Sequence, residues 1–188
     1  MNRTAILVAL AGALSFPAFG ADSYTIDSRH TFPSFELSHQ GFSVQRGRFN
    51  KTAGKMTLDT AARTGSIDVA IDAASIDTGL EELEKHLRGE DFFDVAKYPT
   101  LAFKSKALRF DGDKVVGADG ELTMHGVARP VSLNIDHFRC APNPMNKKPT
   151  CGANATTTIK RSEFGVSKYV PAVGDEVRIA IQVEAVKD

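Results

Sequence analysis

Hydrophobic and polar residues alternate along most of this chain with a period of two. In residues 66–72, for example, Ile67, Val69 and Ile71 alternate with polar or small residues. This period is typical of β-strands that have one dry and one wet face. The stretches that show it are residues 34–39, 55–59, 66–72, 100–105, 131–136 and 176–186. Turn-forming residues recur between them, at 51–54, 62–65, 111–113, 118–120 and 173–175.

Residues 78–89 break the alternation and predict one helix of about ten residues between two strands. Thr78 and Glu81 match a capping box, and Gly89 stands where a helix would stop. The segment carries three leucines at helical spacing, Leu80, Leu83 and Leu87.

About eight antiparallel strands with one apolar face have two common solutions, a two-sheet sandwich and a closed barrel. Periodicity alone does not choose between them. The chain has no Trp and twelve Phe spread along its length. An eight-stranded barrel has an interior that side chains can fill or that can hold one small ligand. We therefore expect an all-β domain over residues 21–188.

Residues 1–20 have the features of a cleaved secretory signal peptide. A basic start at Arg3 is followed by an apolar stretch over residues 5–14 and by small residues at Ala18 and Gly20. Removing this segment takes away one of the 23 basic residues, so the exported chain carries 22 basic and 23 acidic residues, a net charge of −1. This balance argues against a nucleic-acid partner, which needs a basic patch.

Two cysteines, Cys140 and Cys151, bracket a segment rich in Pro, Asn and Lys. An even count in an exported chain indicates a disulfide. The spacing matches neither a C-x-x-C redox motif nor a zinc pattern, so we expect a structural bridge.

The sequence shows no assembled catalytic or metal-binding motif. The five histidines lie on separate elements, and no nucleophile elbow, phosphate-binding loop or dinucleotide fingerprint is present. We expect no metal site. Asp91 and Asp94, near His86 and Arg88, form either an acid–base group or, as we favour, a salt-bridge cluster in a turn. His39 continues the inward face of its strand, and serves either as a backbone-bonded residue or as a polar contact for a ligand head group.

Four stretches of the chain resemble the YceI-like family. They are "YTIDSRHTFPSFELSHQGFSVQRGRFNKTAGKMTLD", "HLRGEDFFDVAKYPTLAFKS", "GELTMHGVARPVSL" and "KRSEFGVSKYVPAVGDEVRIAIQVEA", which together span the exported chain. The resemblance implies a lipocalin-like, eight-stranded antiparallel β-barrel with an elongated internal tunnel. It also implies a bacterial periplasmic protein that binds a long isoprenoid chain, such as the tail of a quinone or a polyprenyl phosphate. The Cys140–Cys151 segment departs from the family pattern, and would alter ligand access if it lay near the mouth.

On this basis we expect a carrier, store or sensor of isoprenoid lipid or isoprenoid quinone, with no catalytic residues and no other cofactor. Transient membrane contact and a homodimer are compatible with this role. For the ligand head group we select His39, Arg46 and Arg161. Of Phe92 and Phe93, we expect one to point into the tunnel and the other to pack under the helix, with two core residues as the alternative. The remaining tunnel residues expected are Phe35, Leu37, Met56, Leu58, Ile67, Val69, Ile71, Leu101, Phe103, Val131, Leu133, Ile135, Ile179 and Ile181.

Two other functions remain open. One is an enzyme that acts on a lipid or quinone in the same cavity, which would require His39, His86 or Asp91 for turnover. The other is a stress-response or interaction module with a packed core, which would bind no lipid.

Overall fold

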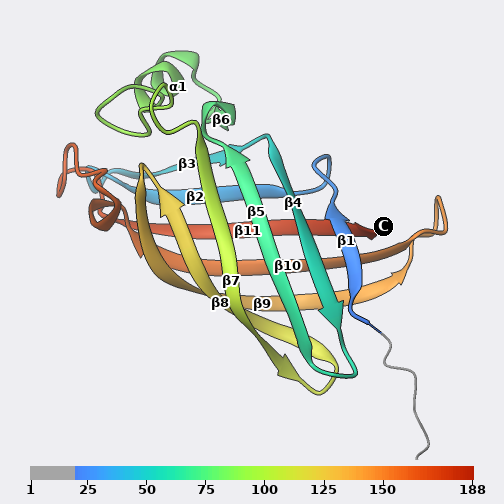
Figure 1. The fold of residues 1–188 in the computed structure, drawn as a ribbon. Helices are drawn as coiled ribbons and strands as arrows, with labels where there is room; N and C mark the ends of the chain where they lie inside the picture. The colour runs from blue at the N-terminus through green and yellow to red at the C-terminus, as the bar shows by residue number, and fades with distance from the viewer. Residues whose placement is uncertain (1–19) are drawn as a thin grey trace, which may run out of the picture.

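The computed structural model describes residues 20–188 and is built mainly of antiparallel strands (Figure 1). The expected signal peptide, residues 1–20, lies outside the described residues except for Gly20. The strands are β1 (Asp22–Ile26), β2 (Phe32–His39), β3 (Ser43–Phe49), β4 (Thr52–Asp59), β5 (Thr64–Asp72), β6 (Ile76–Asp77), β7 (Thr100–Asp111), β8 (Lys114–Met124), β9 (Val127–Pro142), β10 (Pro149–Lys160) and β11 (Glu176–Lys187). The helices are α1 (Glu81–Leu87) and two short 3₁₀ turns, Ala73–Ser75 and Arg161–Phe164.

Eight of these strands form a closed ring. Their order is β1-β4-β5-β7-β8-β9-β10-β11, and β11 pairs back with β1. All of these pairings are antiparallel. The expected eight-stranded antiparallel barrel with one helix is therefore confirmed, and the sandwich is excluded.

Strand β11 has two successive partners along the same edge. Its end pairs with β1, where Tyr24 lies opposite Lys187, and its first half pairs with β2, where Phe35 lies opposite Ile179. Thus β1 and β2 occupy the same place in the ring one after the other, and β3 and β6 extend the sheet beyond β2.

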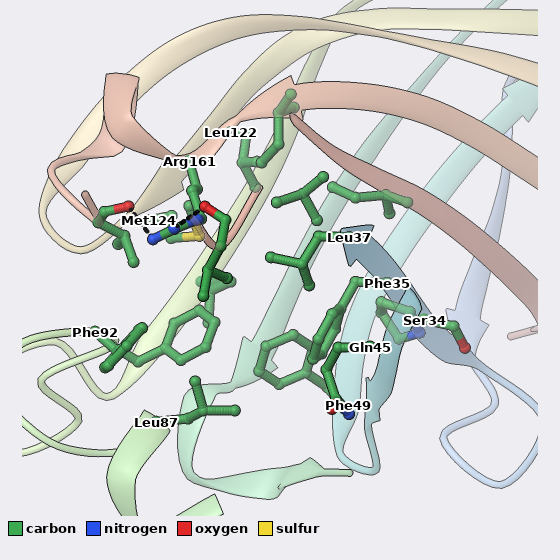
Figure 2. Close-up of a pocket in the computed structure, with 18 of the residues that line it drawn as sticks. Ser34, Phe35, Leu37, Gln45, Phe49, Leu87, Phe92, Leu122, Met124 and Arg161 are labelled. Atoms are coloured by element: carbon green, nitrogen blue, oxygen red, sulfur yellow. Dashed lines mark hydrogen bonds between the residues drawn. The ribbon is translucent and has the colours of Figure 1, made fainter. Parts of the chain in front are cut away.

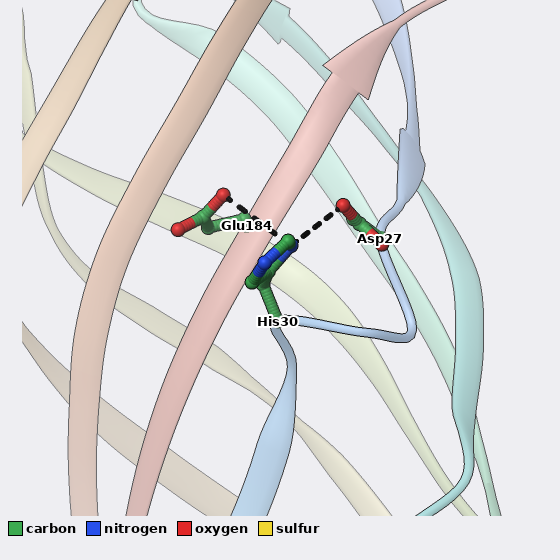
Figure 3. A group of neighbouring side chains, drawn as sticks. All are labelled: Asp27, His30 and Glu184. Carbon is green, nitrogen blue, oxygen red and sulfur yellow. Dashed lines mark hydrogen bonds and ion pairs between the residues drawn. The ribbon is translucent and has the colours of Figure 1, made fainter. Parts of the chain in front are cut away.

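The break between β1 and β2 is held by a polar turn (Figure 3). The Asp27 carboxylate lies 2.9 Å from His30 Nδ1 and accepts the Arg29 backbone N–H at 3.0 Å. Buried Thr31 donates its hydroxyl to the Glu184 carbonyl and accepts the Glu184 N–H. These bonds fasten the turn to β11, so β1 and β2 are kept in line.

Acid is expected to weaken this turn. The hydrogen bond from His30, with bonds from Arg29, lowers the pKa of Asp27 from 3.8 to about 2. Because the folded-state pKa is lowered, the stabilisation is present above about pH 4 and is lost as the pH falls through 2. We expect Asp27→Asn to reduce the free energy of unfolding by about 1 kcal/mol at pH 7, allowing for solvent screening, and to have a smaller effect at pH 3. Urea titrations at both pH values measure this, with exposed Asp113→Asn as the control; equal losses for Asp27→Asn at both pH values would contradict it.

Two hydrophobic clusters fill the barrel at different heights. The smaller cluster fills the end at β1 and contains Tyr24, Ile26, Leu58, Val115, Cys151 and Ala185. The larger cluster lies toward α1 and includes Phe49, Leu101, Phe103, Leu122, Leu133 and Phe164. Val69, Leu108 and Ile135 pack against both clusters and separate the two levels.

The helix is shorter than expected and begins differently. Glu81 does not form the expected capping box; instead the Thr78 N–H donates to the Glu84 carboxylate at 2.9 Å. Gly79, with a φ of +77°, turns the chain between Thr78 and the helix, so that the carboxylate of Glu84 rather than that of Glu81 accepts the hydrogen bond from Thr78. At the other end the Gly89 N–H donates to the His86 carbonyl, one residue after the C-cap Arg88, as the sequence indicated.

The expected disulfide is present. Cys140 and Cys151 lie directly opposite each other on β9 and β10, with their Cα atoms 4.0 Å apart. The hairpin that they bracket projects from the end of the barrel away from α1 (Figure 1). The segment is therefore distant from the α1 end of the barrel.

Removing the bridge is expected to lower stability without changing the α1 end. Closing a loop of this length stabilises a fold by roughly 3 kcal/mol in the chain-entropy model. We expect Cys140→Ser/Cys151→Ser to lose about 2–3 kcal/mol of unfolding free energy in urea. Amide hydrogen exchange of the strands at the α1 end should stay unchanged, and a parallel loss of protection there would contradict the separation of the two ends.

Candidate functional site

A cavity of about 430 Å³ lies inside the barrel near α1 (Figure 2). Strands from around the ring, α1 and the loop that follows Phe164 contribute to its wall. Almost all of the surface is apolar, with aromatic and branched aliphatic side chains. Of the expected tunnel residues, those that line the cavity are Phe35, Leu37, Ile71, Phe92, Phe93, Leu101, Phe103, Val131, Leu133, Ile179 and Ile181.

Strand register explains why these side chains converge. Phe35 lies opposite Ile179 across β2 and β11, and Ile71 lies opposite Leu101 across β5 and β7. Directly opposed residues of antiparallel strands point to the same face of the sheet. A closed ring has one inner face, and these opposed pairs lie on it.

Five expected tunnel residues do not line the cavity. Leu58 belongs to the smaller cluster, Met56, Val69 and Ile135 pack against that cluster, and Ile67 packs against the larger one. The alternation correctly predicted that their side chains lie on the inner face of the sheet. In the structure, however, they lie at a different height along the barrel from the cavity. The cavity is therefore confined to the α1 half of the interior rather than running the length of the barrel.

Several cavity residues were not singled out from the sequence. Leu83 and Leu87 had been recognised as helical leucines, but their pattern did not reveal what the helix covers. Met124, Ile159 and Thr157 lie on strands without a clean apolar alternation. The residues missed also include Phe49, Leu122, Val166, Tyr169, Val173 and Val177.

Phe92 and Phe93 both line the cavity, and Phe92 also packs against α1, so the structure combines in Phe92 the two roles that we had expected to be divided between the pair. Phe93 meets the ring of Phe49 edge to face at 5.5 Å. Phe92 contacts the His86 ring of α1 at 4.9 Å and lies 6.3 Å from Tyr169. Through these contacts, Phe92 joins α1 to the loop that carries Tyr169, and Phe93 joins the segment after α1 to Phe49 of β3.

The three expected head-group residues lie in different places. His39 and Arg161 line the cavity, whereas Arg46 does not. Arg46 lies opposite Glu36 in the β2–β3 pair and bonds to its carboxylate at 3.1 Å on the outer face. Its neighbour Gln45 takes the inward place instead, because the register puts Gln45 opposite inward Leu37.

Arg161 is a buried cation at the cavity wall, only 5% exposed (Figure 2). Its Nε donates to the Gly174 carbonyl at 2.8 Å, and Nη1 and Nη2 donate to the Val166 and Val173 carbonyls, each at 2.9 Å. Burial lowers the pKa of Arg161 and the nearby Asp175 carboxylate opposes the change. The side chain fastens the loop after Phe164 and brings a positive charge to an otherwise apolar cavity.

The charged residues around Phe92 and Phe93 pair with separate partners. Asp91 bonds to Lys168 at 3.2 Å, and Arg88 lies 3.9 Å from Glu84. The Asp91–Lys168 pair joins the α1–β7 segment to the loop after Phe164. These contacts favour the structural interpretation over an acid–base group centred on His86.

Within residues 20–188, one group of side chains offers metal-ligating atoms close together. Asp27, His30 and Glu184 each present an atom within 4.8 Å of the others (Figure 3). The hydrogen bonds of the β1–β2 turn already account for this arrangement. None of the three lines the cavity.

Among residues 20–188, no helix combines the length and the hydropathy needed to cross a membrane.

Comparisons with known proteins agree along nearly the whole chain. The model of the YceI-like domain matches residues 24–185. A UPF0312 protein of Pseudomonas putida (strain GB-1) is 36% identical, over 100% of this chain and 98% of its own. A UPF0312 protein of Vibrio cholerae serotype O1 is 32% identical over 100% of both chains.

Solved structures show the same fold. Burkholderia cenocepacia BcnA matches with a TM-score of 0.72 and 29% identity, over 85% of this chain and 98% of that one. A polyisoprenoid binding domain from Saccharophagus degradans matches with a TM-score of 0.66 over 88% of this chain and 98% of that one. Its 16% identity supports the fold alone.

Proposed function

The chain belongs to the YceI-like domain family, and from this premise we propose that it binds a long-chain isoprenoid lipid in the cavity beside α1. The observation that carries the proposal is the cavity itself, an apolar chamber of about 430 Å³ inside a closed barrel. Pockets of this size and character are typical of small-molecule sites. The polyisoprenoid-binding function of the Saccharophagus degradans domain, which shares the fold, is consistent with it.

Physical chemistry favours a protein carrier for such a ligand. Exposing a chain of roughly 40 carbons to water would cost on the order of 30 kcal/mol, at ~0.8 kcal/mol per CH₂. That exceeds the limit of non-covalent affinity, ~18–21 kcal/mol. An apolar cavity makes exchange with a membrane nearly neutral, because one hydrocarbon environment replaces another.

The size of the cavity bears on how such a chain is held. A CH₂ group is about as large as a water molecule, which occupies ~30 Å³. A cavity of about 430 Å³ therefore holds about 14 carbon atoms of a lipid chain. We propose that a longer chain extends through the mouth or displaces the side chains that pack against both clusters, Val69, Leu108 and Ile135.

Arg161 and His39 are the proposed contacts for a polar head group. Arg161 has five N–H donors, of which three are directed at backbone carbonyls. The others are available to a phosphate or a quinone oxygen. Because Arg46 lies on the outer face, we no longer include it in this set.

We propose that the protein is exported to the periplasm and acts there by binding rather than by catalysis. The expected signal peptide supports export. An enzyme in the same cavity would lose turnover on substitution of His39, His86 or Asp91, whereas a carrier would at most bind more weakly.

The direct test is mass spectrometry of an organic extract from protein purified out of its native periplasm, with delipidated protein as the control. We expect an isoprenoid in a stoichiometric amount, and its mass would identify the head group and chain length. A clean extract from folded, disulfide-bonded protein that also fails to take up added prenol would overturn the proposal in favour of an interaction module.

A further inference from the structure

Exposed apolar side chains gather at the cavity end of the barrel. Phe42 and Val44 are 89% and 47% exposed, and Tyr169 and Val170 are 52% and 37% exposed. Phe42 lies on the turn between β2 and β3 and Val44 lies at the start of β3, whereas the other two lie on the loop between Phe164 and β11. We call these four residues the mouth patch. A cluster of this kind on a soluble domain typically marks an interaction site.

The two segments that carry the mouth patch are joined to each other and to the cavity. The Gln40 N–H donates to the Ala172 carbonyl at 2.8 Å, and the Gly174 N–H donates to the Ser38 carbonyl at 2.8 Å. Gln40, Ala172 and Tyr169 also line the cavity. The mouth patch is therefore continuous with the apolar interior.

Neither segment carries a charged side chain. Residues 40–44 read QGFSV and residues 169–173 read YVPAV, in a chain in which 24% of residues are charged. Moving these residues themselves out of water thus desolvates no ion, which is the largest obstacle to insertion in an apolar phase. The charge beside them, Lys168, lies 5.6 Å from the Tyr169 ring and is paired with Asp91. Tyr169 also combines an apolar ring with a polar tip, as residues at a membrane interface do.

We propose that the mouth patch docks the barrel on a neutral lipid bilayer, with Phe42 inserted deepest, so that hydrocarbon passes between membrane and cavity without crossing water. The inference rests on the proposed function, because a bilayer is the phase in which an isoprenoid lipid dissolves. A neutral surface fits best, because the patch lacks the cluster of Lys and Arg that anionic lipids attract. Shallow insertion of this kind buries side chains by ~5–10 Å.

The test is co-sedimentation of delipidated protein with phosphatidylcholine vesicles. We expect Phe42→Ser to lower the vesicle partition coefficient about tenfold, because it removes one large apolar side chain from the contact. The matched control is Met145→Ser, since Met145 is 90% exposed but lies on the hairpin at the other end of the barrel. Thermal unfolding of both variants checks that each remains folded.

A second measurement separates docking from ligand binding. Phe42 does not line the cavity, so Phe42→Ser should take up farnesol in solution as wild type does but acquire prenol from vesicles about tenfold more slowly. Absence of vesicle binding, or equal losses for Phe42→Ser and Met145→Ser, would overturn docking even if farnesol uptake upheld the proposed function. Phe42-dependent docking without any farnesol uptake would uphold docking and refute the proposed function. A dimer that Phe42→Ser dissociates, with no vesicle binding, would assign the patch to a second copy of the chain.

Discussion

Replacing Leu133 with Trp is expected to reduce the lipid that co-purifies with the protein from about one molecule per chain to almost none. Leu133 lies on β9, is buried, and lines the cavity. An indole at this position would occupy space that the ligand needs, while the strand keeps its backbone pairing. Because the cavity accommodates part of the added volume, the cost in stability should stay within the ~1–3 kcal/mol typical of overpacked cores. Quantitative mass spectrometry of the extract, with urea unfolding in parallel, measures both effects.

The matched control places the same side chain outside the barrel. Val116 lies on β8, is 39% exposed and does not line the cavity. The Val116→Trp variant should therefore keep full lipid occupancy. Phe103→Trp, on β7, provides a second test from another strand of the cavity wall and should behave like Leu133→Trp. Unchanged occupancy in both cavity variants would refute the assignment of the cavity as the ligand site.

Replacing Arg161 with Met is expected to destabilise the fold by about 3 kcal/mol or more. The substitution leaves the carbonyls of Val166, Val173 and Gly174 without their donor in a buried setting, and each unsatisfied group costs about 1–3 kcal/mol when it stays dry. Water entering from the cavity would recover part of this loss. Urea unfolding of the delipidated variant measures the effect without any contribution from ligand.

Two variants make this prediction specific. Arg161→Lys keeps the charge but lacks the planar guanidinium, so its single ammonium cannot bond to all three carbonyls. It should therefore lose less stability than Arg161→Met but remain less stable than wild type. Arg46→Met removes an arginine that is 70% exposed on the outer face, and should change the unfolding free energy by less than about 0.5 kcal/mol. A loss for Arg161→Met no larger than that for Arg46→Met would show that the buried bonds do not hold the loop.

The period-two pattern predicted the strands well where they carry clear alternation. Residues 66–72 and 176–186 form the greater parts of β5 and β11, respectively. In contrast, β10 reads "PTCGANATTTIK", and its inward Thr157 is too polar to reveal a buried face. The glycines of β8 obscure the pattern in a similar way, since Gly117 and Gly120 lack the side chains that would show it.

The position of the cavity could not be predicted from alternation, because the pattern gives the face of a sheet and not the height along the barrel. Strands tilt within a barrel, so inward residues of one strand lie at different levels. Val69 and Ile71 are both inward residues of β5, yet only Ile71 lines the cavity. The error with Arg46 had another origin: the register of β2 and β3 decides whether Gln45 or Arg46 points inward, and sequence alone does not fix that register.

The pairing of β1 with β11 has a consequence for the time order of folding. It joins residues 24–26 to residues 185–187, so the ring cannot close until nearly all of the described chain is available. Contacts between residues so far apart in sequence slow folding, because the entropy of a long loop is lost before the contact forms. In a nascent chain the apolar side chains of the interior would therefore remain uncovered until β11 is available. Protection from aggregation during that interval would be as important to its yield as the stability of the finished barrel.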